Sequence, residues 1–320
     1  MTSPVSESSD FSLEKTLRLS VDKLYVGGED LLQEIESGLN TVRLAHPRVG
    51  YQGVAGSFGE QATLEYFRDA PDSISHYREF EEVLRALCAG EIDYGVLPIE
   101  NSFAGDVLEM SDLIIRYNLY IVGEHILRVR HNLLGLPGAD VQEIRNVYSH
   151  PQALSQCRKF LRAHPEMIEV PYANTALAGQ YVAQERDVQK ASIGSLRCAE
   201  LYGLSVLAEN IQTAQNNYTR FIVLSRRMEI SGACDKVSVV FSTMHTSGAL
   251  YGILSHFAYN GLNLLKIQSR PKREAPWEYV FFLDIAGNLE DANVLIALGR
   301  VREQSSYFKL LGNYVQFRME

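Results

Sequence analysis

The sequence predicts an α/β protein with two domains, the second smaller than the first. Its 320 residues are enough for two domains of ordinary size. From Arg48 to Arg227, short apolar strands alternate with helical patterns, which is typical of a layered domain with a largely parallel sheet. From Lys236 onward the order is β-α-β-β-α-β, the ferredoxin-like arrangement.

The first 47 residues form a separate segment. Residues 1–10 are polar. Residues 12–45 carry apolar side chains at helical spacing, interrupted at Gly27-Gly28, and Pro47 closes the segment. Residues 1–47 are therefore predicted to be a helical arm that packs on a core or contacts a second copy of the chain.

The first domain is predicted over residues 48–227. Its helices carry ordinary boundary signals: Gly90 ends one, Pro151 begins another, and Asn174 is placed to cap a third. Strands are predicted at 48–53, 93–101, 146–150, 167–173, 191–194 and 219–227, helices at 57–67, 79–90, 106–117, 151–163, 175–184 and 195–202, and an extended segment at 119–129.

Residues 228–235 are predicted to be a linker, and residues 236–320 the second domain. The spacing of apolar residues predicts the strands and helices of this second domain. Strands are predicted at 236–243, 262–269, 278–287 and 307–317, and helices at 247–260 and 290–303.

Composition excludes several classes of function. The net charge is -9 and no basic run is visible, which argues against a nucleic-acid partner. A small anionic substrate needs only one local cation and is not excluded. No apolar run approaches the ~18 residues of a membrane helix, so no membrane partner is expected.

Cysteine usage and the N-terminus indicate a cytoplasmic protein. The four cysteines are far apart and form no CxxC pair, which fits a reducing compartment. Residues 1–15 lack the apolar region of a signal peptide.

Two polar clusters follow predicted strands, where open α/β sheets bind ligands. Glycines in Gly53–Ala62 precede a helix, which suits either an anion at the helix start or a tight turn. Glu100, Asn101 and Ser102 in Pro98–Val107 form either a hydrogen-bonding ledge or a helix cap.

Two further clusters complete the set. Ser149, His150 and Gln152 surround a helix start, where a carboxylate gains roughly 0.3–1 kcal/mol, although His150 could equally be a core histidine. Thr219 and Arg220 offer a hydroxyl and a cation just before an apolar strand, or else a β-forming residue and a surface ion pair. No metal-ligand set, Ser-His-Asp spacing or Walker A loop is visible, and no cofactor or metal is expected.

Together, these clusters resemble the prephenate dehydratase family in order and spacing. The glycine-rich opening and the P-I-E-N-S, S-H-P-Q and N-x-T-R-F segments match Gly53–Ala62, Pro98–Ser102, Ser149–Gln152 and Asn217–Phe221. The C-terminal part resembles the ACT regulatory domain of that family. Its ligand segments match Gly248, Ala249 and Leu250, and then Gln268, Ser269, Arg270 and Pro271.

The resemblance implies a lyase that removes CO₂ and the ring hydroxyl of prephenate together, giving phenylpyruvate for phenylalanine biosynthesis. It implies a catalytic fold of two lobes, like type II periplasmic binding proteins, and phenylalanine as feedback effector. Thr219 matches the threonine that hydrogen-bonds the leaving hydroxyl, and Arg220 suits a bidentate carboxylate clamp. Asn101, Ser102, Ser149 and Gln152 are the other candidate catalytic residues, and Ser57, Glu100, His150, Asn174, Thr175 and Phe221 the candidate substrate-binding residues.

Three positions depart from the family pattern. Gly59 stands where serine is frequent, Thr213 where aspartate is common, and Gln268 where glutamate usually precedes S-R-P. Residues 1–47 are too short for the chorismate mutase domain of bifunctional relatives and suggest a remnant at most.

Alternatives stay open at this point. The same chemistry on arogenate, the 2-amino counterpart of prephenate, depends on a single substrate contact. A non-catalytic aromatic-acid sensor and a scaffold in which only the ACT domain works are also compatible with the pattern. The resemblance implies a homodimer or homotetramer.

Overall fold

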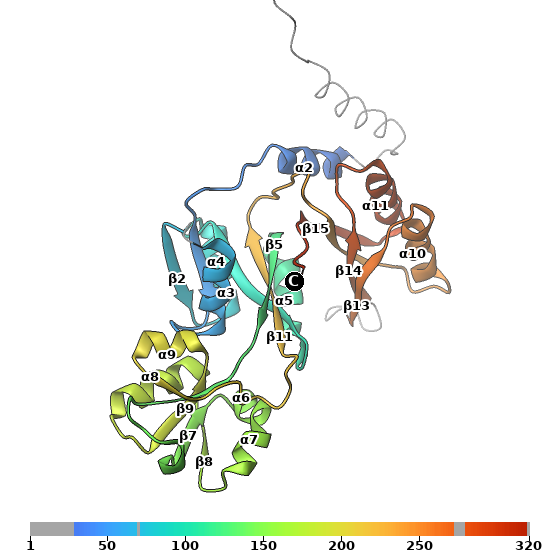
Figure 1. The fold of residues 1–320 in the computed structure, drawn as a ribbon. Helices are drawn as coiled ribbons and strands as arrows, with labels where there is room; N and C mark the ends of the chain where they lie inside the picture. The colour runs from blue at the N-terminus through green and yellow to red at the C-terminus, as the bar shows by residue number, and fades with distance from the viewer. Residues whose placement is uncertain (1–28, 69–70, 272–278, 319–320) are drawn as a thin grey trace, which may run out of the picture. The chain divides into compact units, whose positions relative to one another are not determined.

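The computed structural model describes residues 29–68, 71–271 and 279–318 (Figure 1). The described chain forms two compact units. One contains residues 44–118 and 125–226, and the other contains residues 29–43, 119–124 and 227–318. Most of the predicted N-terminal arm lies outside the described residues.

We call the unit of residues 44–118 and 125–226 the 44–226 unit. Its first sheet has the strand order β2-β1-β3-β11-β5, where only residues 125–128 of β5 belong to this unit, and β4 pairs with β3. β1 pairs in parallel with β2 and β3, whereas β11 runs antiparallel to β3. The buried apolar run of β11 fits its place inside the sheet, between β3 and β5. The strands are β1 (Arg48–Gln52), β2 (Ser73–Tyr77), β3 (Tyr94–Asn101), β4 (Gly105–Asp106), β5 (Tyr120–Arg128) and β11 (Tyr218–Ser225).

A second sheet in the same unit has the order β10-β6-β9-β7-β8. β7 is parallel to β8 and β9, while β6 is antiparallel to β9 and β10. The two sheets confirm the two-lobed α/β fold, but both are mixed, so the expected largely parallel sheet was wrong. The strands are β6 (Asn132–Gly135), β7 (Asn146–Ser149), β8 (Ile168–Pro171), β9 (Lys190–Gly194) and β10 (Ser205–Ala208).

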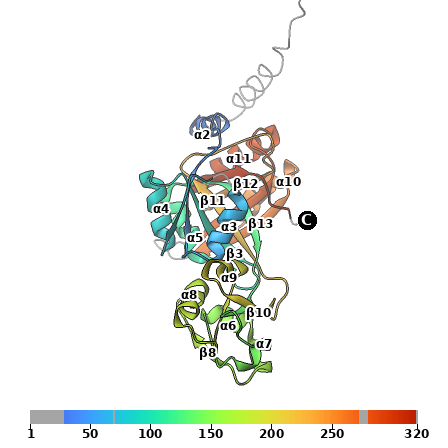
Figure 2. The same ribbon diagram turned by 60° about the vertical axis from the view of Figure 1, so that its left-hand side comes forward.

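Helices cover both faces of the second sheet (Figures 1 and 2). Neighbouring residues of β6 show this: Leu133 packs in one cluster with α6 and α7, and Leu134 in another with α8 and α9. Of the described helices, none is long and apolar enough to cross a membrane. The helices of this unit are α3 (Phe58–Phe67), α4 (Phe80–Ala89), α5 (Leu108–Tyr117), α6 (Pro151–Gln156), α7 (Arg158–Ala163), α8 (Thr175–Glu185), α9 (Leu196–Tyr202) and the 3₁₀ turn η1 (Val141–Glu143).

The predicted helix 151–163 is in fact two helices, with a break at Cys157. A later segment of the chain fills the break. The Thr213 N–H donates to the carbonyl of Gln156 at 2.7 Å, and the Lys159 N–H donates to Thr213 Oγ1 at 3.3 Å. Backbone groups at the junction thus bond outside the helix, which periodicity alone does not reveal.

The other unit contains a four-stranded antiparallel sheet of order β13-β14-β12-β15, which confirms the ferredoxin-like arrangement. Its core also includes Leu31 and Ile35 of α2, so this part of the N-terminal segment packs on a core. The elements are α2 (Glu29–Leu39), β12 (Lys236–Ser242), α10 (Ala249–Tyr259), β13 (Leu264–Pro271), β14 (Tyr279–Ala286), α11 (Ala292–Gln304) and β15 (Tyr307–Tyr314).

A buried ion cluster lies within this unit. Lys236 is 4% exposed, and its Nζ is 2.8 Å from Glu124 Oε2 and 3.5 Å from Asp284 Oδ2. Ser238 donates its hydroxyl to Asp284 Oδ1 at 2.6 Å. Removing the Lys236 cation would leave two buried carboxylates without this shared partner, which is costly.

We therefore expect Lys236→Met to lower the free energy of unfolding by about 3–5 kcal/mol. The measurement is urea unfolding followed by circular dichroism. Lys190→Met is the matched control, because the Lys190 partners Glu185 and Asp187 are 39% and 43% exposed and such pairs contribute about 1 kcal/mol or less. Equal effects of the two substitutions would contradict the assignment.

Candidate active site

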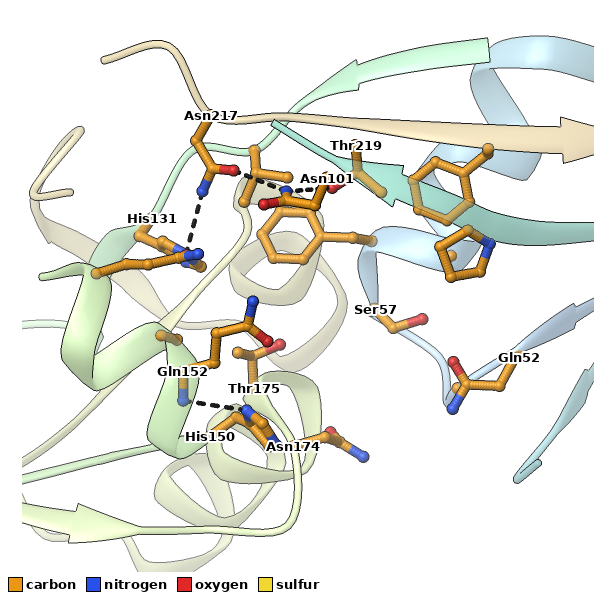
Figure 3. A pocket seen from close by; sticks show the side chains of 18 residues that line it. Gln52, Ser57, Asn101, His131, His150, Gln152, Asn174, Thr175, Asn217 and Thr219 are labelled. Carbon is orange, nitrogen blue, oxygen red and sulfur yellow. Dashed lines mark hydrogen bonds between the residues drawn. The ribbon is translucent and has the colours of Figure 1, made fainter. Parts of the chain in front are cut away.

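A cavity of about 310 Å³ lies within the 44–226 unit (Figure 3). Asn101, Asn217 and Thr219 lie together on one side of it, and His150, Gln152, Asn174 and Thr175 on another. Both sheets and their helices contribute. The lining residues are Gln52, Gly53, Ser57, Phe58, Gly59, Pro98, Asn101, Val129, His131, His150, Gln152, Ala153, Gln156, Asn174, Thr175, Asn217, Thr219 and Phe221.

The orientation of the Asn101 amide is fixed by the backbone. Asn101 Oδ1 accepts from the N–H groups of Phe103 at 3.0 Å and Ala104 at 2.8 Å, and a backbone N–H can only donate. Asn101 Nδ2 is therefore the donor on the other side. It donates to Asn217 Oδ1 at 2.8 Å and to Thr219 Oγ1 at 2.9 Å.

The orientation of the Asn101 amide also fixes the orientations of two further side-chain amides. Asn217 Oδ1 accepts from Asn101, so Asn217 Nδ2 is the donor to Gln156 Oε1, at 3.1 Å. Gln156 Oε1 then also faces His131 Nε2, at 2.7 Å. Because that oxygen can only accept, His131 must carry its proton on Nε2. We call Asn101, Asn217 and Gln156 the amide array.

The array makes Thr219 a hydrogen-bond donor toward the cavity. Its oxygen already accepts from Asn101 Nδ2, and no described residue accepts its hydroxyl hydrogen. Thr219 pairs directly with Asn101 across β11 and β3, so the strand register sets this contact. A hydroxyl held in this way can donate to an oxygen atom of a bound ligand.

His131 is a cavity residue that the sequence patterns did not indicate. It is 2% exposed and lines the cavity, and within the described chain no group bonds its Nδ1. Burial lowers its pKa, which keeps the ring neutral, with an acceptor lone pair on Nδ1. A histidine between polar residues just before the short apolar run Leu133-Leu134 was the available signal.

The opposite side of the cavity is built from helix starts. Asn174 caps α8, its Oδ1 accepting from the Leu177 N–H at 2.7 Å, which confirms the predicted cap. Thr175 is the first residue of α8. His150 precedes α6, and its Nδ1 accepts from the Gln152 N–H at 3.2 Å. These groups can orient ligand oxygens without adding a full charge.

The buried histidine gives a pH dependence. In the unfolded chain a histidine titrates near 6.5, whereas folded His131 has a lowered pKa. Below about pH 6.5 the unfolded state takes up a proton that the folded state does not, so stability falls, by up to about 1.4 kcal/mol per pH unit, until the pH reaches the folded pKa.

We therefore expect His131→Gln to have a shallower loss of unfolding free energy than the parent between pH 7.5 and 5.5, measured by urea titration. The exposed His76→Gln variant is the control and should follow the parent. Parallel curves for the parent and His131→Gln would show that His131 charges freely in the folded protein.

The comparison with family models decides the family. The model described as prephenate dehydratase matches residues 49–229, more than half of the chain. The chain belongs to the prephenate dehydratase family. The Arabidopsis thaliana protein named arogenate dehydratase/prephenate dehydratase 1, chloroplastic, is 36% identical over 283 residues, covering 83% of this chain and 71% of its own length.

Solved structures agree with a prephenate dehydratase fold. Prephenate dehydratase from Arthrobacter aurescens in complex with L-Phe has a TM-score of 0.76 and 31% identity, covering 84% of this chain and 90% of that one. GqqA, described as a novel type of quorum quenching acylase, has a TM-score of 0.77 and 28% identity, covering 84% of this chain and 97% of that one.

Four candidate residues of the prephenate dehydratase site lie outside the cavity. Ser149 is fully buried and donates its hydroxyl to the Ile193 carbonyl at 2.8 Å. Ser102 donates to the Asn216 carbonyl at 2.8 Å and accepts from the Tyr218 N–H at 2.9 Å. Short hydroxyl side chains satisfy neighbouring backbone groups readily. Ser102 thereby stabilises the strand ends that carry Asn101 and Thr219, whereas Ser149 links β7 to β9.

Arg220 and Glu100 also do not line the cavity. Thr219 and Phe221 both line it, whereas Arg220, at a register shift of β11 against β3, lies beside Glu100. There its Nη2 is 3.3 Å from Glu100 Oε2. The geometry favours the ion pair over a direct carboxylate clamp. The candidates that do line the cavity are Ser57, Asn101, His150, Gln152, Asn174, Thr175, Thr219 and Phe221.

The remaining special positions lie elsewhere. Gly59 lines the cavity in α3, where a Cβ would meet the Gln52 carbonyl at 2.5 Å, so the absence of a side chain has a packing reason. Thr213 lines a second cavity instead. The predicted effector segments lie in the other unit: Gly248 precedes α10 with φ 81°, and residues 268–271 are the end of β13.

Proposed function

We propose that this protein converts prephenate to phenylpyruvate, with loss of CO₂ and water, in phenylalanine biosynthesis. The observation that carries the proposal is the Thr219 hydroxyl, which Asn101 holds as a donor into a cavity lined by neutral polar groups. Membership of the prephenate dehydratase family supports the reaction class.

In this reaction negative charge moves from the carboxylate on one side of the ring to the hydroxyl that leaves from the other side. The bond between ring and carboxylate breaks, and its electron pair enters the new aromatic ring as CO₂ departs. The ring C–O bond then releases hydroxide, which becomes water with one proton drawn from solvent. A hydroxyl donor placed at that oxygen stabilises the developing charge, and Thr219 is suited to this role.

The neutral lining suits the other end of the reaction. None of the lining residues is Lys or Arg. A cation beside the departing carboxylate would stabilise the substrate more than the transition state, because the carboxylate loses its charge. Neutral donors such as Gln152 and Asn174 orient that group without this penalty.

Arg220 is proposed as a positioning residue. Its register partner across β11 and β3 is Glu100, directly beside the pair Thr219 and Asn101. The ion pair between Arg220 and Glu100 ties the two strands together next to this contact. This supports a role through strand position, although the bidentate clamp suggested by the resemblance stays an alternative.

Acyl transfer, the reaction class of an acylase such as GqqA, finds less support in this geometry. A serine or threonine nucleophile needs an adjacent base. In the described cavity, His131 bonds to Gln156 and His150 to the Gln152 N–H, and neither bonds to a hydroxyl.

An assay separates the two substrates of the family. Purified protein is mixed with prephenate or with arogenate, and phenylpyruvate is followed by its absorbance in alkali and phenylalanine by chromatography. We expect a higher kcat/KM with prephenate. A preference for arogenate would assign the alternative activity, and turnover of neither substrate would overturn the proposal.

We also propose that residues 236–320 form an ACT domain that binds phenylalanine and inhibits the enzyme, and that residues 48–227 form the catalytic domain. The relative from Arthrobacter aurescens was solved with L-Phe. In this chain Gly248 is exposed at the start of α10, and Ala249 and Leu250 are half-buried. Assembly as a homodimer or homotetramer is likewise a proposal.

Gln268→Glu is expected to tighten phenylalanine binding by about tenfold. Gln268 lies half-buried in the proposed effector segment, and a carboxylate bonds an ammonium group about twice as strongly as an amide does. Calorimetry gives the affinity, and the shift of substrate KM with phenylalanine gives the coupling, typically 1–3 kcal/mol. Gln142→Glu, in the exposed turn η1, is the control. If neither the parent nor the variant binds phenylalanine, the proposal that this domain binds phenylalanine is wrong.

A further inference from the structure

A second cavity, of about 440 Å³, adjoins the active site within the same unit. It shares two residues with the first cavity, Gln156 and Asn217, both members of the amide array. The other lining residues come from α6, α7, the loop after β3 and the segment before β11. They are Phe103, Ser155, Arg158, Lys159, Arg162, Gln212, Thr213 and Ala214.

The second cavity is basic. Arg158, Lys159 and Arg162 line it, and no aspartate or glutamate does. In residues 29–68, 71–271 and 279–318, no carboxylate pairs with any of these three cations. Their positive charge is therefore available to an anion.

A buried amide in this cavity lacks a partner. Gln212 is 4% exposed, and its Oε1 accepts from the His131 N–H at 2.9 Å. Because that contact fixes the oxygen, the remaining atom is the donor Nε2, which no described group accepts from. A buried donor without a partner is unfavourable, and a ligand oxygen would supply the missing acceptor.

The backbone segments that carry the cations and the amide are fixed to each other. Thr213 lies in the break between α6 and α7, bonded to the Gln156 carbonyl and the Lys159 N–H. The segment that carries Gln212 is thus fixed against the helix that carries Arg158 and Arg162. A backbone fixed in this way lowers the ordering cost of binding, although the exposed cationic side chains still have to be ordered.

We propose that the second cavity binds a small carboxylate with an apolar body. The three cations and the Gln212 amide would hold the carboxylate, and Phe103, which is 62% exposed, and Ala214 would contact the body. The ligand would also touch Gln156 and Asn217, the side chains that hydrogen-bond to His131 and Asn101. This site is distinct from the proposed effector segments at residues 248–250 and 268–271.

Calorimetry with phenylacetate tests the proposal independently of catalysis. Thr213→Asp keeps an acceptor for the Lys159 N–H but adds a carboxylate at an exposed position beside the cations. Arg158→Gln combined with Arg162→Gln removes two of them. Both variants should bind phenylacetate about tenfold or more weakly than the parent.

A charge-matched control combines Arg68→Gln and Arg186→Gln, two exposed arginines at helix ends, and should bind within about twofold of the parent. Thermal melts establish that each variant is folded. No phenylacetate binding by the parent, or equal affinity in all folded variants, would overturn the proposal. Loss confined to Asn101→Asp would place the ligand in the first cavity. Binding of inorganic phosphate but not phenylacetate would overturn the assignment of the ligand as a carboxylate with an apolar body.

Discussion

Thr219→Val is expected to lower kcat on the order of 10²–10³-fold while changing KM little. The substitution keeps the shape of the side chain and removes the hydroxyl that Asn101 orients. A donor aimed at a departing hydroxide acts mainly in the transition state, so its loss appears in kcat rather than in substrate affinity. Steady-state kinetics with the preferred substrate measures both constants.

Thr219→Ser is the matched control, because it keeps the hydroxyl and removes only a methyl group. It should retain most of the parent kcat. The proposed role of Thr219 fails if a folded Thr219→Val protein keeps near-normal kcat, or if the serine variant is as slow as the valine variant.

Asn101→Asp is expected to cause a loss of similar size by reversing a hydrogen bond. The parent amide donates to Asn217 Oδ1 and to Thr219 Oγ1. A carboxylate can only accept, so the Thr219 hydroxyl would donate to it instead of to the substrate. We expect kcat to fall roughly 10²-fold or more, with partial recovery at low pH as the introduced carboxyl becomes protonated.

Asn174→Asp provides the control for added negative charge. Asn174 lines the same cavity and caps α8, and aspartate caps helices about as well as asparagine. Because Asn174 is proposed to orient the substrate carboxylate, KM should rise in this variant, whereas kcat should fall less than in Asn101→Asp. The combined Asn101→Asp and Thr219→Val variant should be little slower than either single variant, because both remove one interaction. Multiplying losses would show that Asn101 acts separately from Thr219.

Where local signals were strong, the sequence was sufficient to predict the fold. The Asn174 cap, the βαββαβ order and the buried run of β11 were all visible, because spacing and capping are short-range properties. Strand β2 was missed because it lies at a sheet edge with mostly exposed residues, so its pattern has no apolar alternation. The direction of β11 depended on its neighbour β3, which pattern alone does not give.

The candidate site was predicted only in part, and the reason is chemical. Asn101 and Thr219 were found because polar residues at strand ends are conspicuous. The resemblance to the family also named Ser149 and Ser102, yet their hydroxyls bond to nearby backbone groups. His131 and Gln156 were missed, because the hydrogen bond that joins their side chains connects residues 25 positions apart and has no local sequence signal.

The pairing of β3 with β11 has a consequence for how the protein acquires activity. Asn101 and Thr219 are 118 positions apart in the chain, and the second sheet is formed by the intervening residues. Contacts of such long range are slow to form, since loop closure must precede them. During synthesis, β3 cannot pair with β11 until β11 has left the ribosome. We expect that recovered catalysis, rather than recovered helix content, will report the last step of refolding.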